Sequence, residues 1–170
     1  MNNFWKNKNV LVTGHSGFKG SWLSLMLKNF DANIFGISSE PRKGVYELTS
    51  ISSILDEELF FDLSGVDVDV NNKIKKFDPD VVFHFAAQSL VIKSYESPLE
   101  TVKSNILAPV NLIESLHSNL NKLTLVIATT DKVYKNPGDK NQEDGELGGY
   151  DFYSNSKVGK ELIIDAYKNH

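Results

Sequence analysis

The chain has 170 residues, of which 41% are hydrophobic and 24% are charged, as is usual for a soluble globular protein of one domain. Its net charge of −4 and its pI near 5.5 disfavour nucleic-acid binding, because that function needs a basic surface. The lack of cysteine excludes disulfides, thiolate catalysis and cysteine-ligated zinc, and it suits the cytoplasm. The histidines show no metal-ligand spacing, and no apolar stretch is long enough to predict a signal peptide or a membrane-spanning helix.

Short apolar segments alternate with helical patterns along the chain. The predicted strands are residues 10–13, 32–38, 59–63, 81–87 and 122–130, and the predicted helices are residues 17–29, 68–76, 98–118 and 151–168, with a polar loop over 136–149. This alternation predicts βαβ units, and right-handed crossovers then place helices on both faces of a parallel sheet. We therefore expect an α/β fold, a Rossmann-type doubly wound sheet with strand order 3-2-1-4-5 that binds ligands at the carboxyl ends of its strands.

Gly14, Gly17 and Gly20 mark the junction between the first predicted strand and the first predicted helix. The first glycine permits a tight turn, the second lets a pyrophosphate approach the backbone, and the third lets the helix pack closely on the sheet. The helix N-terminus adds free N–H groups and a partial positive charge, so the pattern predicts dinucleotide binding, with a plain turn as the alternative. Between the glycines, Lys19 either neutralises a phosphate or is solvated, and His15 either donates to a phosphate or fills the turn.

The residues that follow the second and third predicted strands bear on the choice of coenzyme. An acidic residue there binds the ribose hydroxyls of NAD, whereas an arginine suits the 2′-phosphate of NADP. Residues 38–42 offer two serines, Glu40 and Arg42, so both coenzymes stay open. Asp62, at the end of the third predicted strand, either accepts a hydrogen bond from the adenine amino group or is an ordinary cap or turn residue.

Tyr153 and Lys157 lie four residues apart, on one face of the last predicted helix. A neighbouring ammonium favours the phenolate, which can then take a proton from an alcohol while hydride leaves its carbon. Thr130 ends the fifth predicted strand, where its hydroxyl can bond the same alcohol, and the alternative is a surface tyrosine–lysine pair. Asp131 and Lys132 follow at once and are either the acid and base of a second chemical step or solvated loop charges.

Several stretches of the sequence are similar to one group of enzymes. They are NVLVTGHSGFKGSWLSLML, VVFHFAAQSLVIKSYESPLET, SNILAPVNLIES, TTDKVYKN and ELGGYDFYSNSKVGKE. Together they resemble the extended short-chain dehydrogenase/reductases that act on nucleotide sugars, and GHSGFKGSWL and the DK-Y segment resemble the CDP-glucose 4,6-dehydratase branch. The resemblance runs from Phe4 to Tyr167, and Asp131-Lys132 stands where the dTDP-glucose branch usually has Asp-Glu.

The resemblance implies roles for the candidate catalytic residues. Tyr153 is the base for oxidation at sugar C4, assisted by Lys157 and Thr130, and NAD takes the hydride. Asp131 protonates the C6 hydroxyl as it leaves. Lys132 matches the position of the C5 base, a role for which it must lose its proton. The implied substrate is CDP-glucose and the implied product is CDP-4-keto-6-deoxyglucose, a precursor of deoxysugars in bacterial surface polysaccharides.

The resemblance also implies the coenzyme contacts, with NADP left open beside NAD. The implied contact residues come from five segments of the chain and are Gly14, His15, Gly17, Phe18, Lys19, Gly20, Asp62, Leu63, Ala86, Ala87, Gln88, Tyr153 and Lys157. For Gln88 the alternative is a polar residue at a strand end, and Asn105 matches a family asparagine whose role can be structural. The family pairs the helices at 98–118 and 151–168 across a homodimer; alternatively, their apolar positions face the sheet.

Members of the resembled group are about twice as long as this chain. We therefore expect residues 1–170 to form an NAD(P)-binding Rossmann domain, truncated relative to the family, that lacks the C-terminal substrate region and has weak or no turnover. The alternatives are a non-catalytic NAD(P)-binding or dimerising fragment and another nucleotide-sugar epimerase or reductase of the same group. No nucleic-acid or membrane partner is expected.

Overall fold

The computed structural model describes residues 3–117, 120–136 and 140–168 and divides the chain into two compact units. The sheet unit consists of Met1–Ala86 and Asn111–Ala128, and the helical unit consists of Ala87–Val110 and Thr129–His170. That residues 1–170 form a single domain stays a prediction. No helix within the described ranges is long and apolar enough to cross a membrane.

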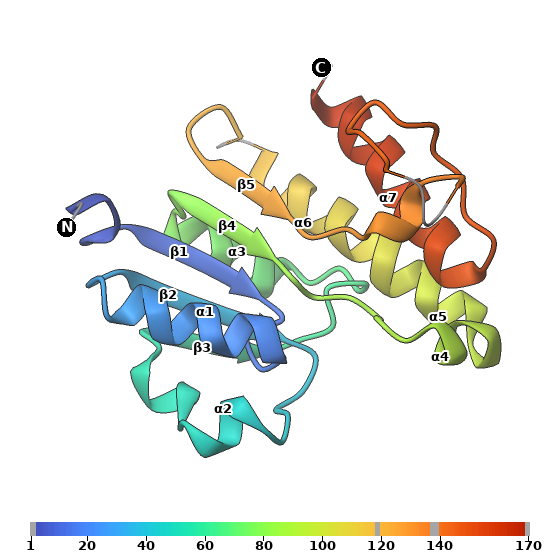
Figure 1. Ribbon diagram of the computed structural model, residues 1–170. Coiled ribbons are helices and arrows are strands. Elements are labelled where there is room, and N and C mark those ends of the chain that lie inside the picture. Colours follow the sequence, from blue (N-terminus) through green and yellow to red (C-terminus); the bar gives the residue numbers. More distant parts are fainter. Residues whose placement is uncertain (1–2, 118–119, 137–139, 169–170) are drawn as a thin grey trace. The chain divides into compact units, whose positions relative to one another are not determined.

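The sheet unit contains five parallel strands (Figure 1). They are β1 (Asn9–Thr13), β2 (Asn33–Ser38), β3 (Glu57–Phe60), β4 (Val81–His84) and β5 (Thr124–Ile127). Their order is β3-β2-β1-β4-β5, so the predicted Rossmann-type order is confirmed. The central strand β1 pairs with β2 and β4, and Val10 lies in register with Ile34 on one side and Val81 on the other.

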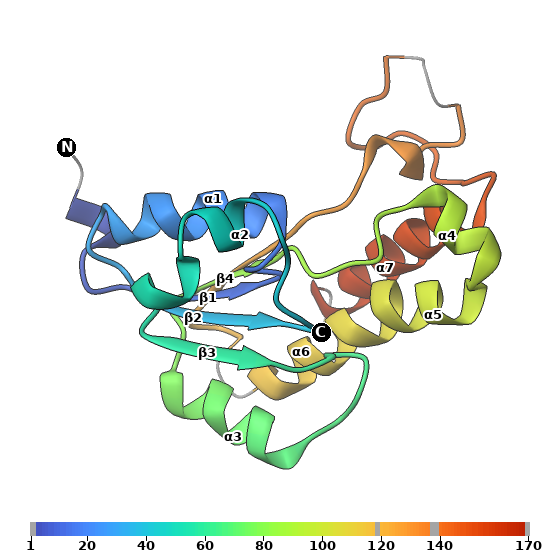
Figure 2. The same cartoon turned by 90° about the horizontal axis from the view of Figure 1, so that it is seen from below.

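Helices cover both faces of this sheet, as Figure 2 shows. α1 (Phe18–Lys28) and the short α2 (Val45–Leu48) lie over one face, and α3 (Val68–Phe77) and the end of α6 (Ala108–Leu116) lie over the other. The core between β1, β2 and α1 contains Val10, Val12, Leu27, Ala32, Ile34 and Val81. Because parallel strands are covered on both sides, they consist of continuous apolar runs and not of alternating ones.

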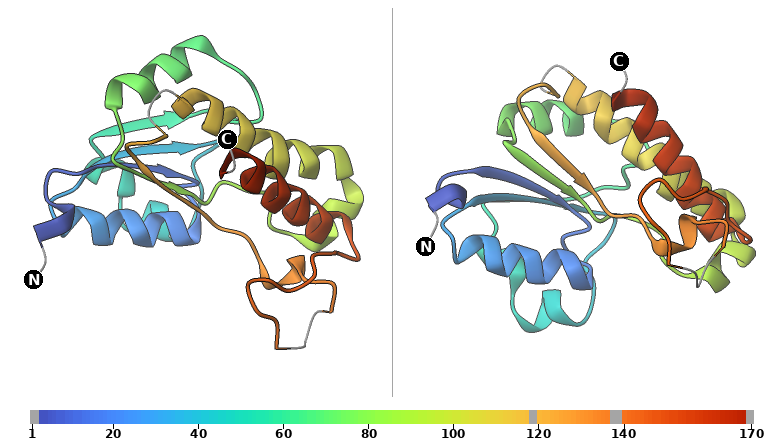
Figure 3. Two further views of the ribbon diagram at one scale, coloured as in Figure 1. Left: turned by 90° about the horizontal axis from the view of Figure 1, so that it is seen from above. Right: turned by 45° about the horizontal axis from the view of Figure 1, so that its top comes forward.

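The helical unit is built around α7 (Phe152–Lys168), which packs against the short 3-10 helix Asp131–Val133 and against three other segments (Figure 3). These are α4 (Val91–Glu96), α5 (Pro98–Val102) and a π-helical turn at Lys103–Leu107 that continues into α6. The Asp151 carboxylate caps α7 by accepting a hydrogen bond of 2.7 Å from the Ser154 N–H.

Several predicted boundaries are wrong. β3 spans Glu57–Phe60 where residues 59–63 were expected, and β4 ends at His84 where the prediction extended to 87. β5 spans only Thr124–Ile127, and the predicted helix 98–118 is interrupted by the π-helical turn, with Ser118 outside the described residues. Apolar residues continue beyond the last hydrogen bonds between strands, so apolar composition overestimates the lengths of β4 and β5. The short helix α4 has no N-terminal capping side chain and was not predicted. Of the polar loop 136–149, residues 137–139 lie outside the described part.

Candidate functional site

The glycine turn between β1 and α1 leaves no space for side chains at two of its positions. Gly14 has φ +75°, a conformation that side chains disfavour, and a Cβ there would lie 2.7 Å from the Ala86 backbone nitrogen. A Cβ on Gly20 would collide with the Gly14 carbonyl oxygen and lie 2.7 Å from the His15 Cα. The first and third glycines therefore close the turn and pack α1, as their spacing predicts.

The N-terminus of α1 can receive an anion. The first hydrogen bond of the helix runs from the Ser21 N–H to the Gly17 carbonyl oxygen at 2.9 Å. The N–H groups of residues 18–20 therefore come before the first hydrogen bond within the helix. The first turn reads FKGS and contains no acidic side chain that would repel a phosphate, and Phe18 and Lys19 are exposed. Backbone N–H groups, the helix dipole and Lys19 together fit the pyrophosphate of a dinucleotide.

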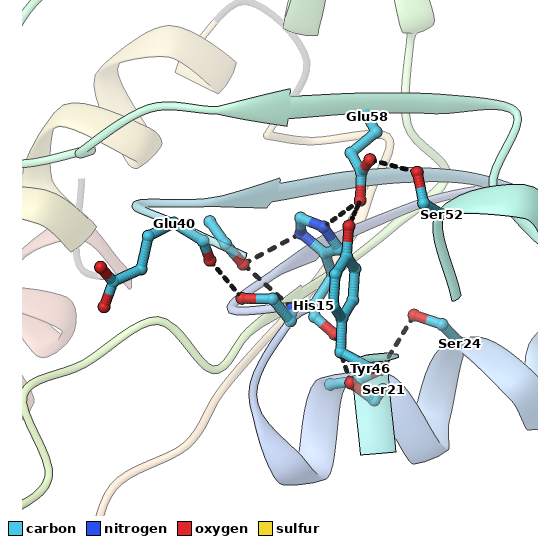
Figure 4. A network of polar contacts seen from close by, with 10 residues as sticks. His15, Ser21, Ser24, Glu40, Tyr46, Ser52 and Glu58 are labelled. Carbon is cyan, nitrogen blue, oxygen red and sulfur yellow. Dashed lines mark hydrogen bonds and ion pairs between the residues drawn. The ribbon is translucent and has the colours of Figure 1, made fainter. Parts of the chain in front are cut away.

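His15 is fully buried beneath this turn, as Figure 4 shows. Its Nε2 lies 2.8 Å from a Glu58 oxygen, and its Nδ1 lies 3.0 Å from the Ser38 hydroxyl. Because a carboxylate only accepts, Nε2 donates to Glu58 and the Ser38 hydroxyl donates to Nδ1. The imidazole fills the turn, so the interpretation in which its side chain donates to a phosphate is wrong. His15 can therefore contact a coenzyme through its main-chain atoms.

Glu58 is the centre of the network around His15 (Figure 4). Burial pushes its pKa upward, but hydrogen bonds from Ser52, Tyr46 and His15 outweigh burial and hold the pKa below its ordinary value. Burial and the hydrogen bond to Glu58 raise the pKa of Tyr46, so this phenol stays protonated and donates. These contacts connect the glycine turn to β3 and α2, and the sequence analysis missed them because they join four separate segments.

Asp62 and Leu63 lie in the loop after β3, not at the strand end. The Asp62 carboxylate accepts a hydrogen bond of 2.9 Å from the Ser64 N–H, which makes it a turn residue, and its side chain is exposed. Leu63 is buried, and its carbonyl oxygen accepts from the Asn111 amide at 2.9 Å. Ala86, after β4, donates its N–H to the Thr13 hydroxyl at 3.4 Å. The sheet unit thus brings the glycine turn and Ala86 together.

A network of amide and hydroxyl side chains lies within the helical unit. Asn105 accepts from the Gln88 N–H at 2.9 Å and donates to the Ser156 hydroxyl at 2.8 Å, and the Gln88 amide donates to Thr101 at 3.0 Å. Gln88 and Asn105 are both buried. Asn105 therefore connects the segment after Ala87 to α7, where the Ser156 hydroxyl in turn donates to the Tyr153 carbonyl oxygen at 2.6 Å.

Tyr153 and Lys157 lie on one face of α7, as predicted, with the Lys157 ammonium 5.6 Å from the centre of the Tyr153 ring. Lys157 is buried, and so is Lys160 one turn further on. Burial, the nearby Lys157 charge and a hydrogen bond with Lys157 lower the pKa of Lys160 from 10.5 to about 7. Sequence analysis missed Lys160; its spacing of three from Lys157 was the available signal.

Thr130 begins the short 3-10 helix Asp131–Val133, which packs against α7. Its hydroxyl donates to the Asp131 carboxylate at 3.1 Å and accepts from the Lys132 N–H at 3.4 Å. Asp131 and Lys132 are both exposed. The helical unit thus holds all five candidate catalytic residues: a phenol, a buried ammonium, a hydroxyl, an exposed carboxylate and an exposed lysine.

Comparison with known families decides the relationship. A family model described as GDP-mannose 4,6 dehydratase matches residues 11–170. The chain belongs to this family. The resemblance to extended short-chain dehydrogenase/reductases that act on nucleotide sugars is thereby confirmed.

Individual relatives agree with this assignment. CDP-glucose 4,6-dehydratase of Salmonella typhimurium is 39% identical over 98% of this chain and 47% of its own length. The structure of UDP-glucose-4-epimerase from Stenotrophomonas maltophila with bound NAD and formylated UDP-arabinopyranose has a TM-score of 0.81 at 23% identity, over 95% of this chain and 48% of that one. MoeE5 in complex with UDP-glucose and NAD has a TM-score of 0.76 at 25% identity, over 95% and 49%. The chain spans about half the length of the relatives it matches.

Proposed function

We propose that this chain is part of a nucleotide-sugar 4,6-dehydratase that converts CDP-glucose to CDP-4-keto-6-deoxyglucose. The observation that carries the proposal is the 39% identity to a CDP-glucose 4,6-dehydratase along 98% of the chain. The next relatives, among them a probable dTDP-glucose 4,6-dehydratase, are 29% identical. A dehydratase is therefore favoured over an epimerase, and cytidine over other nucleotides.

The proposed coenzyme is NAD, which is bound in several of the similar solved structures. The glycine turn fits its pyrophosphate, because Gly14 and Gly20 exclude side chains and the N-terminus of α1 presents N–H groups. Bound there, NAD would supply the acceptor for a hydride from C4 of the sugar and the donor of that hydride to C6. The other proposed coenzyme contacts are Gly17, Phe18, Lys19, Asp62, Leu63, Ala86, Ala87 and Gln88.

Tyr153 is proposed to act as the base of the oxidation. It takes the proton of the C4 hydroxyl, and the C4 hydrogen leaves as hydride, so the alcohol becomes a ketone. Lys157 supports the phenolate by its charge at 5.6 Å from the ring. Thr130 orients the same hydroxyl. Asn105 positions the turn of α7 that carries Tyr153, because its amide donates a hydrogen bond of 2.8 Å to the Ser156 hydroxyl.

The dehydration that follows needs one base and one acid. The C4 ketone makes the C5 proton acidic, and Lys132 in its neutral form is the candidate to remove it. Asp131 in its protonated form donates to the C6 hydroxyl, which leaves as water while a C5–C6 double bond forms. Hydride at C6 and a proton at C5 then complete the product, and the coenzyme is regenerated.

The test is the formation of a 4-keto sugar from CDP-glucose by the whole protein of which this chain is proposed to be part, compared with dTDP-glucose, UDP-glucose and GDP-mannose at equal concentration. We expect CDP-glucose to be the preferred substrate and Tyr153→Phe to lower the rate by about 100-fold or more with unchanged NAD affinity. Tyr167→Phe, on the same helix, is the matched control and keeps the rate. Preference for another nucleotide sugar would contradict the specificity, and a rate that survives Tyr153→Phe would contradict the assigned base.

The second candidate function is a non-catalytic NAD(P)-binding module, for which the glycine turn alone would be sufficient. It predicts coenzyme binding with no 4-keto sugar from any of the four substrates.

A homodimer is proposed with either function, because Leu99 on α5 and Leu162 on α7 are exposed apolar side chains. Light scattering tests the dimer: Leu99→Glu should yield monomers, and an unchanged mass would rule out pairing through α5.

A further inference from the structure

Three N–H groups of the glycine turn donate hydrogen bonds within the sheet unit. The Gly14 N–H donates to the Ile37 carbonyl oxygen at 2.7 Å, and the Gly17 N–H donates to the Gly14 carbonyl oxygen at 2.9 Å. The Ser16 N–H donates to the Ser38 hydroxyl oxygen at 3.1 Å, in a buried contact. Two of these acceptors belong to the backbone and do not depend on side-chain identity, whereas the third is a side chain. The orientation of the Ser16 peptide therefore depends on what holds Ser38.

The Ser38 hydroxyl is held by the His15 ring. The hydroxyl oxygen lies 3.0 Å from His15 Nδ1, and both residues are buried. When Nδ1 carries no proton, the single hydroxyl hydrogen is donated to it, and the oxygen lone pairs are left for the Ser16 N–H. When Nδ1 carries a proton, two N–H groups compete for the same hydroxyl oxygen. The ring nitrogen that carries the proton thus decides how firmly the Ser16 peptide is held.

Glu58, on β3, decides which ring nitrogen carries the proton. Its carboxylate oxygen lies 2.8 Å from His15 Nε2, and a carboxylate can only accept a hydrogen bond, so Nε2 is the protonated nitrogen and Nδ1 accepts. The hydroxyls of Ser52 and Tyr46 donate to the same carboxylate at 2.6 and 2.9 Å and hold it in place (Figure 4). The hydrogen bonds therefore run in one direction, from the glycine turn to this carboxylate.

We propose that Glu58 is a positioning residue for the coenzyme pyrophosphate. Acting through His15 and Ser38, it fixes the Ser16 peptide and thereby orients the N–H groups with which α1 begins. The inference rests on the proposed function, because it assumes that the glycine turn binds a dinucleotide. Charge alone has the opposite effect, since a carboxylate near an anion site repels the pyrophosphate. The two effects of Glu58 on coenzyme affinity therefore differ in sign and can be distinguished.

The test is calorimetric titration of the 170-residue chain with NAD and ADP, and with adenosine by displacement of ADP. Glu58→Gln keeps the size of the side chain, but its amide can donate as well as accept, so it no longer fixes the protonated ring nitrogen. We expect Glu58→Gln to weaken NAD and ADP by about fivefold and to leave adenosine unchanged, because only the diphosphate contacts the turn. Tighter ADP binding would mean that repulsion dominates and would overturn the positioning role. Glu57→Gln, an exposed change of the same charge on the same strand, is the matched control and should keep all three affinities.

Ser38→Ala breaks the same series of hydrogen bonds at its other end. It should also weaken ADP by about fivefold, and the double variant should bind no more weakly than either single variant, because each change alone releases the Ser16 peptide. Additive losses, or an unchanged ADP affinity in Glu58→Gln, would overturn the positioning role while leaving coenzyme binding intact. Failure of the folded wild-type chain to bind NAD or ADP would instead overturn the proposed function. Tryptophan fluorescence confirms the fold of each variant, and the Glu58→Gln titration decides alone if Ser38→Ala does not fold.

Discussion

The two units of the chain bury different kinds of side chain. In the sheet unit, Val10, Leu11 and Ile34 are fully buried and packed against other apolar groups. In the helical unit, the described residues that are buried are mostly polar, among them Gln88, Asn105, Ser156, Lys157 and Lys160. The sheet unit is therefore stabilised by apolar area, which tolerates imperfect geometry, whereas the helical unit depends on hydrogen bonds that each need their partner.

The stability of each unit can be measured separately. Both tryptophans, Trp5 and Trp22, lie in the sheet unit, so tryptophan fluorescence follows that unit alone. Amide hydrogen exchange in α7 follows the helical unit. The predictions below use these two signals.

Lys160 gives the largest expected effect. The unfolded chain keeps its proton up to the ordinary pKa of 10.5, whereas the folded chain loses it near 7, so the free energy of opening α7 should rise between these values. The expected slope is about 1.4 kcal/mol per pH unit, or about 4 kcal/mol from pH 7 to pH 10. Hydrogen exchange of α7 across this range measures it.

Lys160→Met should flatten the slope and make α7 more stable at pH 6, because the buried group no longer carries a charge. Lys168→Met, an exposed change on the same helix, is the control and should keep the slope. An unchanged slope in Lys160→Met would mean that Lys160 is protonated in the folded state throughout.

Leu11→Ala tests the apolar side of the comparison. Leu11 is in the central strand and fully buried, so its truncation should lower the unfolding free energy of the sheet unit by about 3 kcal/mol. Urea unfolding followed by tryptophan fluorescence measures the loss. Leu48→Ala, on the exposed α2, should change stability by less than about 0.5 kcal/mol. Equal losses in the two variants would show that burial in the sheet is not the source of stability.

Asn105→Ala tests the polar side. It removes the acceptor of the Gln88 N–H and the donor to Ser156, so the helical unit should lose about 2 kcal/mol. Asn105→Asp keeps the acceptor but places a carboxylate oxygen against the Gln88 carbonyl oxygen, to which the Asn105 amide donates at 3.0 Å, so it should lose at least as much. The exposed Asn155→Ala is the control. Exchange of α7 amides reports the result, and protection that survives Asn105→Ala would contradict the dependence on this network.

Glu58→Gln should have the smallest effect. The pKa of Glu58 is held below its ordinary value, so its contribution is present above the ordinary pKa and is lost as pH falls through the folded one. As pH falls below the ordinary pKa, the wild type should lose more stability than Glu58→Gln, measured by tryptophan fluorescence. Glu57→Gln, exposed on the same strand, should behave as the wild type. Parallel acid profiles for wild type and Glu58→Gln would show that the His15 network does not stabilise the ionised carboxylate.

Periodicity and glycine spacing predicted what local sequence determines. The strand order followed from the alternation of strands and helices along the chain, and α1 after the glycine turn and Tyr153 and Lys157 on one helix face followed from patterns within single segments. The burial of His15 and Lys160 did not, because a histidine in a turn and a lysine in a helix ordinarily lie at the surface. Their environment is supplied by Ser38, Glu58 and Lys157, and only the folded chain brings such groups together.

Gly36 in β2 leaves room for the His15 ring: a Cβ at Gly36 would lie 2.6 Å from the His15 Cγ. The two positions are thus coupled sterically. A larger residue at position 36 becomes acceptable only after position 15 has become small, so substitutions should arise in that order along any lineage. Sequences of relatives that carry a side chain at position 36 should accordingly lack a ring at position 15.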